Sequence, residues 1–347
     1  MSGSDFTDAA TLSSAAGQIL TADEWHARRD RHRRRVEDVI GPYLRDRRRG
    51  QKHPVLDFLF TYYSSRPAHI ERYHPGYGVV LLAPSSGRDD TAPYEALRGY
   101  QRMSVETGAT QTSTRPVEDA GDAHGSPTGV GVGADYLCRR HTALRETKAL
   151  LAATASRPPR FGCFGLHEWA MVYRTDAPRH DLPLRLGAAG TDAVVESMPL
   201  RCTHFDAFRF FTDDARPRNE FALTTADRLT RDQPGCLHTT MDLYRTTMTL
   251  TPLLDSELTL RAFELVRDAR ELDMRASPYD LGDLGYSPVP VETPAGRATY
   301  IHEQTALAER GATLRAEIES RIDTLLSVAM RIMARADASF PASNIGT

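Results

Sequence analysis

The strongest constraint on how this chain folds is a repeated arrangement of cysteine and histidine between residues 160 and 245. Three apolar, aromatic segments each place a cysteine two to four residues before a histidine, with a carboxylate close behind it. The pairs are Cys163 with His167, Cys202 with His204, and Cys236 with His238, and the carboxylates are Glu168, Asp206 and Asp242. Because buried polar groups need partners, we predict that the three segments form the walls of one pocket.

The composition argues against a generally nucleic-acid-binding protein and against a membrane protein. The chain has 347 residues, enough to bury a sizeable core, and its net charge of −3 gives no global attraction for nucleic acid or anionic membrane. Binding of that kind would need a local patch. Four cysteines, no secretory signal and no apolar run of membrane-spanning length predict a cytoplasmic protein without a membrane segment. The sequence does not determine the oligomeric state.

Apolar periodicity predicts a mainly helical α+β fold with a small antiparallel sheet. A capping box at Thr21 and Glu24 indicates the start of the first helix. Further helices are expected over 54–65, 136–156, 166–173, 238–254, 256–274 and 294–335, and strands over 78–82, 192–197 and 200–211. Residues 1–20 are expected to be disordered and 21–347 to form a single domain. Within that domain 84–134 is expected to be loop-rich, with 106–126 poorly ordered.

A basic stretch follows the first predicted cap. Eleven Lys and Arg residues lie between Arg28 and Lys52, and the apolar positions among them are sparse. One interpretation is an arm that contacts the phosphates of DNA. The other is a solvated helix face whose arginines pair with Glu37, Asp38 and Asp46.

The histidines and carboxylates of the first pattern suit a metal ion. Two imidazoles and one carboxylate are sufficient for a site that binds iron, zinc or manganese. His204 and Asp206, two apart on a predicted strand, share a face. His238 and Asp242, four apart on a predicted helix, share another. We therefore predict His204, Asp206, His238 and Asp242 as ligands of a divalent metal cofactor, with a small-molecule substrate.

Three other interpretations of the same residues remain open. The first is metal-free acid–base catalysis, in which surrounding aromatic side chains raise the pKa of Asp206, Asp242 or Glu168 and His167 relays the proton. In the second, the histidines and cysteines are core residues with ordinary hydrogen bonds. In the third, Cys236 is a nucleophile whose pKa is lowered by a helix N-terminus.

Five segments of the chain resemble a bacterial family, common in actinobacteria, that is labelled 3-methyladenine DNA glycosylase. They are HPVLDFLFTYYSSRPA, RPPRFGCFGLHEWAMVYR, LRCTHFDAFRFFT, QPGCLHTTMDLYR and ELDMRASPYDL, within about residues 22–325. The chain lacks the helix-hairpin-helix pattern of the best-known alkyl-base glycosylases. The resemblance implies a DNA-repair hydrolase that removes an alkylated purine.

A glycosylase holds an unstacked base between aromatic faces and activates water with a carboxylate. Asp206 or Asp242 would activate the water, and the Arg28–Lys52 arm would hold the DNA. The predicted substrate-binding residues are Trp169, Tyr173, Phe205, Phe208, Tyr244 and Arg275. With the resemblance included, we predict a DNA glycosylase; the alternative is a metal-dependent enzyme, and the second alternative is a nucleic-acid-binding protein without catalysis.

Overall fold

The computed structural model describes residues 17–86, 88–107, 112–116, 127–178, 180 and 182–338. This part of the chain is mainly helical with one small sheet, as predicted. The α-helices are α1 (Ala22–Arg48), α2 (Pro54–Tyr62), α3 (Pro67–Glu71), α4 (Ala92–Glu95), α5 (Ala134–Arg139), α6 (His141–Ala155), α7 (Leu166–Ala170), α8 (Gly187–Ser197), α9 (Phe205–Phe208), α10 (Arg228–Arg231), α11 (Leu237–Leu250), α12 (Ser256–Arg275) and α13 (Pro294–Ala338). Short 3-10 turns lie at Arg216–Arg218, Thr225–Asp227 and Gly282–Leu284.

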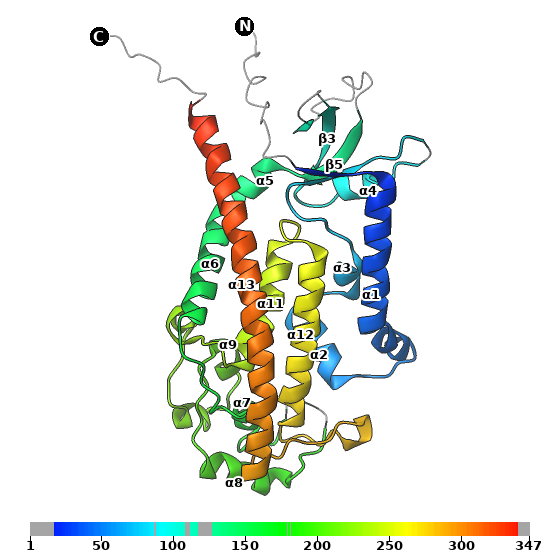
Figure 1. Cartoon of the computed structure of the whole chain (residues 1–347). Helices are drawn as coiled ribbons and strands as arrows, with labels where there is room; N and C mark the ends of the chain where they lie inside the picture. The colour runs from blue at the N-terminus through cyan, green and yellow to red at the C-terminus, as the bar shows by residue number, and fades with distance from the viewer. Residues whose placement is uncertain are drawn as a thin grey trace, which may run out of the picture.

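The sheet has five strands in the order β1-β2-β5-β3-β4 and lies at one end of the elongated molecule (Figure 1). The strands are β1 (Gln18–Leu20), β2 (Val79–Leu82), β3 (Tyr100–Thr107), β4 (Thr112–Pro116) and β5 (Thr128–Val132). All neighbouring pairs are antiparallel except β1 with β2, which is parallel. Gly129 in β5 permits the close pairing with β2, since a Cβ there would lie 2.4 Å from the Leu81 carbonyl oxygen.

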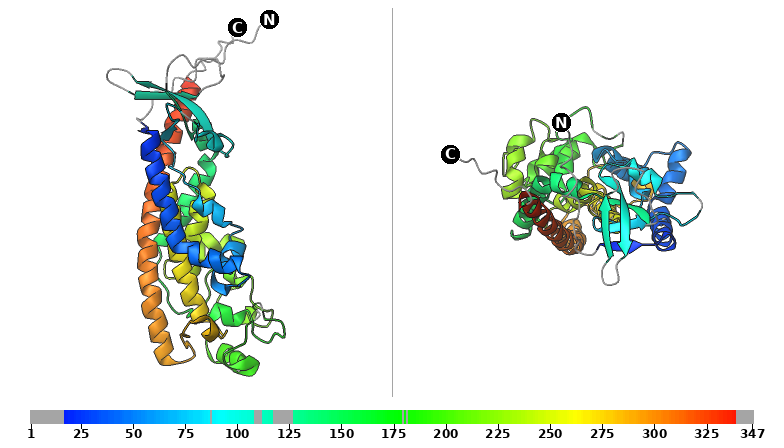
Figure 2. Two further views of the ribbon diagram at one scale, coloured as in Figure 1. Left: turned by 90° about the vertical axis from the view of Figure 1, so that its right-hand side faces the viewer. Right: turned by 90° about the horizontal axis from the view of Figure 1, so that it is seen from above.

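Helices α11, α12 and α13 form the central framework. Helix α13 runs along almost the whole length of the molecule, and α12 packs between it and α2 (Figures 1 and 2). The predicted apolar stripe of α13 is buried at Leu307, Leu314, Ile318, Ile322 and Leu325. Ile301, expected in the same stripe, is 39% exposed. The framework therefore holds the ends of α11 and α12 in fixed positions.

Helix α1 begins with the predicted capping box, in which Thr21 and Glu24 bond reciprocally. The buried indole of Trp25 donates to the Leu82 carbonyl at 3.0 Å and ties the helix to the sheet. Some of its arginines form ion pairs, such as Arg45 with Glu37 at 2.6 Å. Arg31, Arg33 and Arg34 are exposed and have no ion pair within the described residues.

Several predicted elements were wrong. Residues 192–197 lie in helix α8, and 200–211 hold no strand but a bridge at Leu200 and helix α9. The strand predicted over 78–82 is confirmed as β2. Strands β3, β4 and β5 lie within 84–134, predicted to be loop-rich, because its glycine-rich and threonine-rich pieces pair with one another across the sheet. Residues 18–20, predicted disordered, form β1. Residues 1–16 and most of 106–126 lie outside the described residues. No helix within the described part is long and apolar enough to cross a membrane.

Candidate metal centre

The three cysteine–histidine segments converge. His167 lies in the short helix α7, His238 in the first turn of α11, and His204 just before α9. The ring centroids of His167 and His238 are 4.6 Å apart, and those of His204 and His238 are 5.5 Å apart. All three side chains are buried. The convergence predicted from sequence is therefore present in the fold.

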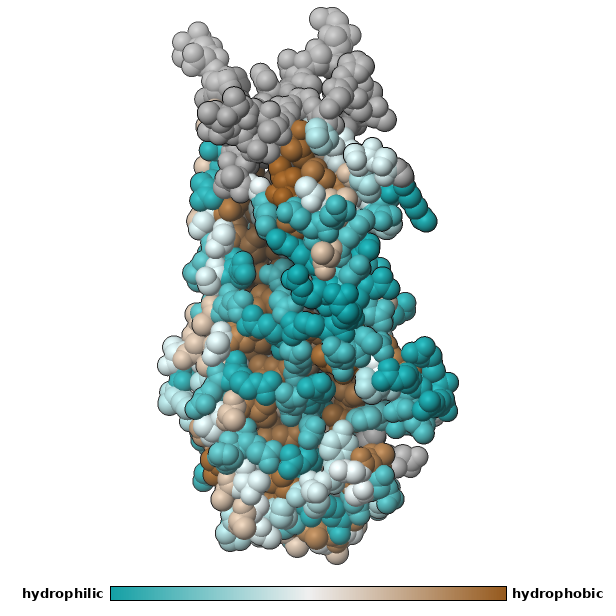
Figure 3. Space-filling model, turned by 45° about the vertical axis from the view of Figure 1, so that its right-hand side comes forward, coloured by the Kyte–Doolittle hydropathy of each residue, from teal (hydrophilic) through white to brown (hydrophobic). Residues whose placement is uncertain are grey.

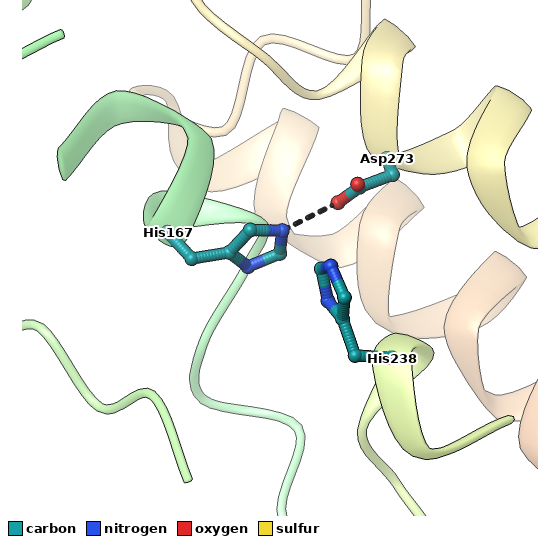
Figure 4. A group of neighbouring side chains, drawn as sticks. All are labelled: His167, His238 and Asp273. Atoms are coloured by element: carbon teal, nitrogen blue, oxygen red, sulfur yellow. Dashed lines mark ion pairs between the residues drawn. The ribbon is translucent and has the colours of Figure 1, made fainter. Parts of the chain in front are cut away.

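A carboxylate that the sequence analysis did not select completes the group. Asp273, in the last turns of α12, points toward the rings of His167 and His238 (Figure 4). One potential ligand atom from each of the three residues lies within 4.8 Å of the others. Asp273 is fully buried, and the two histidines are 4% and 6% exposed. The set of two imidazoles and one carboxylate matches a common class of metal site.

The contact between His167 and Asp273 is a short, buried ion pair. The Nε2 atom of His167 and the Oδ1 atom of Asp273 are 2.8 Å apart, and the carboxylate helps to keep the ring protonated. Among the described residues, the ring of His238 contacts the other two histidines and forms no hydrogen bond. Two ligand atoms bound to one ion at ~2.0–2.2 Å are normally separated by about 3 Å. A bound ion would take the place of the proton between these two atoms.

The charge states fit a metal site as well. Burial, with the positive charge of His167 beside it, holds the pKa of His238 well below its usual range, so its ring offers a lone pair. Burial disfavours a charged His167, but Asp273 and Cys163 outweigh this effect and raise its pKa well above the usual range. Without a metal, His167 therefore carries a proton that a metal has to displace.

Arg270 orients the carboxylate from behind. Its Nη1 atom donates to Oδ2 of Asp273 at 2.7 Å and to Oε1 of Glu168 at 2.5 Å. The guanidinium is fully buried and lies 3.9 Å from the ring centroid of Phe58. Because Oδ2 is engaged, Oδ1 is the oxygen that faces the histidines. Such outer partners fix the orientation of metal ligands.

A small cavity adjoins the histidines. It has a volume of about 10 Å³, close to the minimum for one water molecule. The residues that line it are Cys163, His167, Arg201, Cys202, Thr203, Gln233, Cys236, Leu237, His238, Tyr300 and Gln304. Cys163 also contacts Nδ1 of His167 at 3.4 Å and positions that ring from its other side. The site is thus closed to anything larger than a water-sized ligand in this conformation.

The structure places the four metal ligands predicted from sequence in two different groups. His204, Asp206 and Asp242 do lie close together, but His238 belongs with His167 and Asp273. In the group of His204, Asp206 and Asp242, both carboxylates form ion pairs with arginines. Asp242 pairs with Arg228 at 2.6 Å, and Asp206 pairs with Arg245 at 3.4 Å. The reasoning from a shared strand face was wrong, because His204 and Asp206 are not on a strand.

The acid–base residues predicted from sequence are likewise held in ion pairs. Asp206 also contacts Arg209, Asp242 also contacts Arg245, and Glu168 contacts Arg270. Nδ1 of His204 lies 3.0 Å from a carboxylate oxygen of Asp232 and makes a buried pair of its own. The Glu168–Arg270 pair joins α7 to α12, and the other contacts form a charge network that links α9, α10 and α11.

Most of the aromatic residues predicted to stack on a base are in the core. Trp169, Tyr173, Phe208 and Tyr244 are buried, and only Phe205 is partly exposed. The Trp169 indole donates to the Ala276 carbonyl, and the Tyr173 hydroxyl donates to Glu196. These four residues offer no free face to a base in this structure. Arg275, also predicted to bind substrate, pairs with Glu303 at 2.8 Å.

The interpretation of Cys236 as a nucleophile, left open by the sequence, is not supported by its surroundings. The residue is the N-cap of α11, as expected, but burial raises the pKa of its thiol to about 12. Burial destabilises the charged thiolate by more than the helix N-terminus stabilises it, so the thiol stays neutral.

Asp273 and Arg270 are the important residues that sequence reasoning missed. They stand three apart on α12, in the same stripe as the buried residues Val266 and Ala269. Charged residues in the apolar stripe of an amphipathic helix are a usable signal, because they are buried only when paired.

Comparisons of the chain with protein-family models, with curated proteins and with solved structures find no match. The function is therefore inferred from the geometry of the site and from the family resemblance.

Proposed function

We propose that this protein is a metal-dependent enzyme that acts on a small molecule. Its metal ion binds to His167, His238 and Asp273. The observation that carries the proposal is the convergence of three buried ligand atoms, one each from His167, His238 and Asp273, within 4.8 Å of one another. Among the described residues the neutral ring of His238 forms no hydrogen bond, so its lone pair is available to an ion.

The ligand set indicates what such an ion contributes. Three protein ligands leave coordination positions open for water or substrate. The adjoining cavity has room for one water-sized molecule in this conformation, so a larger substrate requires the site to open. A bound ion would polarise that molecule, and closure of the site would exclude bulk water. Iron, zinc and manganese all accept nitrogen and oxygen ligands of this kind.

Elemental analysis of the chain, purified without a histidine tag, tests the proposal. We expect about one equivalent of a single first-row metal per chain, since sites of this type bind tightly. A content below about a tenth of an equivalent, unchanged after incubation with iron, zinc or manganese and removal of the excess, would exclude a metal-dependent function at this site.

Metal binding is expected to release about one proton per ion at pH 7.5. The pKa of His167 in the metal-free chain is raised, so its ring is protonated there and loses that proton to the metal. Affinity should therefore rise with pH until it passes the pKa of His167, and level off above it. Calorimetric titration in two buffers of different ionisation enthalpy measures the proton count. Equal heats in both buffers would contradict the assignment of His167 as a ligand.

A second candidate function, an N-glycosylase that removes an alkylated purine from DNA, is supported by the family resemblance. One structural observation favours a DNA contact: Arg31, Arg33 and Arg34 of α1 are exposed and have no ion pair within the described residues. The carboxylate required to activate water would be Asp206 or Asp242, released from its arginine partners.

Incubation of the purified protein with methylated DNA, followed by assay of free base, tests this second candidate. Base release that is lost on Asp242→Asn and retained on Asp273→Asn would favour the glycosylase over the metal-dependent enzyme. DNA binding that weakens with salt and releases no base would instead indicate a nucleic-acid-binding protein without catalysis.

A further inference from the structure

A second and much larger cavity lies far from the metal ligands. Its volume is about 700 Å³, within the range of sites for small organic ligands. It is bounded by α1, by the first turns of α12, by residues 317–325 of α13, and by the ends of β1 and β2. Along α12, the 15 residues from Leu258 to Asp273 correspond to roughly 22 Å. The two sites are therefore separate.

The walls of this cavity carry more positive than negative charge. Five arginines line it, against three carboxylates. Arg35 pairs with Glu257 and Glu264, and Arg261 pairs with Glu317. The remaining arginines, Arg28, Arg31 and Arg321, form no ion pair at contact distance within the described residues, although Glu24 lies near Arg28 and Glu317 lies near Arg321. Like charges gathered in a cleft attract an anion, and guanidinium groups match phosphate oxygens.

A buried acceptor without a partner lies in the same wall. His32 lines the cavity and is only 4% exposed. Its Nε2 atom lies 2.8 Å from the Ile70 carbonyl oxygen and must donate to it, so Nδ1 remains as an acceptor. This Nδ1 is buried and has no hydrogen-bond partner. A ligand that supplies a hydroxyl group would satisfy it.

The rest of the cavity lining suits the apolar part of an organic ligand. Tyr73 and Tyr77 are partly exposed in the cavity, and Leu254, Leu258 and Leu325 form apolar surface beside them. The face of the molecule shown in Figure 3 is mostly hydrophilic, with hydrophobic residues visible between the hydrophilic ones. A ligand with both a charged group and a flat apolar part has matching surfaces here.

We propose that this cavity binds a small phosphorylated organic molecule that carries hydroxyl groups, of the size and kind of a nucleoside monophosphate. The phosphate is held by Arg28, Arg31 and Arg321, and a hydroxyl donates to Nδ1 of His32. The ring system packs between the tyrosines and the leucines. This binding site is independent of the metal centre and of its chemistry.

Calorimetric titration of the full chain with adenosine 5′-monophosphate tests the proposal. We expect saturable binding that weakens with added salt, because exposed charges are screened. Adenosine and inorganic phosphate should each bind at least tenfold more weakly, since each lacks half of the recognised groups. The 2′,3′-dideoxy monophosphate should also bind more weakly, because it has no hydroxyl for His32.

Two exposed arginines of the same helix supply a matched pair of variants. Arg31 lines the cavity, and Arg33 does not. Arg31→Ala is expected to weaken binding of the monophosphate about tenfold, and Arg33→Ala by less than twofold. Equal losses in both variants would show general attraction to a basic surface and overturn the site. So would inorganic phosphate binding as tightly as the monophosphate, or no saturable binding of the monophosphate at millimolar concentration.

Discussion

A chain in which Asp273 is replaced by asparagine is expected to lose its metal, from about one equivalent to less than about a tenth. The amide has nearly the same shape as the carboxylate but no negative charge, so it is a much poorer ligand. Loss of an outer-shell partner alone lowers metal affinity about 10- to 100-fold, and loss of a ligand should exceed that. Elemental analysis of the purified variant and calorimetric titration of the metal-free form measure the effect.

The matched control is Asp206→Asn, which makes the same chemical change in the neighbouring group of His204, Asp206 and Asp242. This variant should keep its full metal content, because Asp206 faces Arg209 and Arg245. His238→Ala provides a second loss variant in case Asp273→Asn destabilises the fold. Metal retained in Asp273→Asn and lost in Asp206→Asn would transfer the site to the other group.

Replacing Arg270 by methionine is expected to lower the free energy of unfolding by about 3–5 kcal/mol. The guanidinium is fully buried and bonds to both Glu168 and Asp273. Methionine fills a similar space but leaves two buried carboxylates without their shared cation, and those charges are then far less stable inside the protein than in water. Urea denaturation followed by circular dichroism measures the change.

Arg267→Met is the matched control on the same helix. Arg267 pairs with Asp268, and both side chains are about one third exposed, so a loss below about 1 kcal/mol is expected. Adding Glu168→Gln to Arg270→Met should recover part of the stability, because it removes the carboxylate that has lost its ion-pair partner, whereas Asp273 still lies beside His167. A loss for Arg270→Met no larger than that for Arg267→Met would show that the buried network contributes little to stability.

The sequence was informative where local rules decide the structure. The capping box at Thr21, the start of α13 at Pro294 and the buried stripe around Ile318 follow from periodicity and capping, and both act within a few residues. For the sheet it predicted β2 and missed the other four strands. Strand β5 reads as a loop because of its glycines, and only its neighbours β2 and β3 make those glycines compatible with a strand.

The candidate site shows the same division. The clustering of cysteine and histidine with apolar residues indicated that His167, His204 and His238 would be buried together, since single polar groups are not buried without partners. Which carboxylate lies beside which histidine depends on how the helices pack, and spacing along the chain does not show it. Asp206 and Asp242 are near the histidines in sequence, but their carboxylates form ion pairs with arginines. Asp273 comes 35 residues after His238, and the antiparallel packing of α11 and α12 brings the two together. The sequence by itself determined that these histidines are buried, and the packing of the helices decided that Asp273 lies beside two of them.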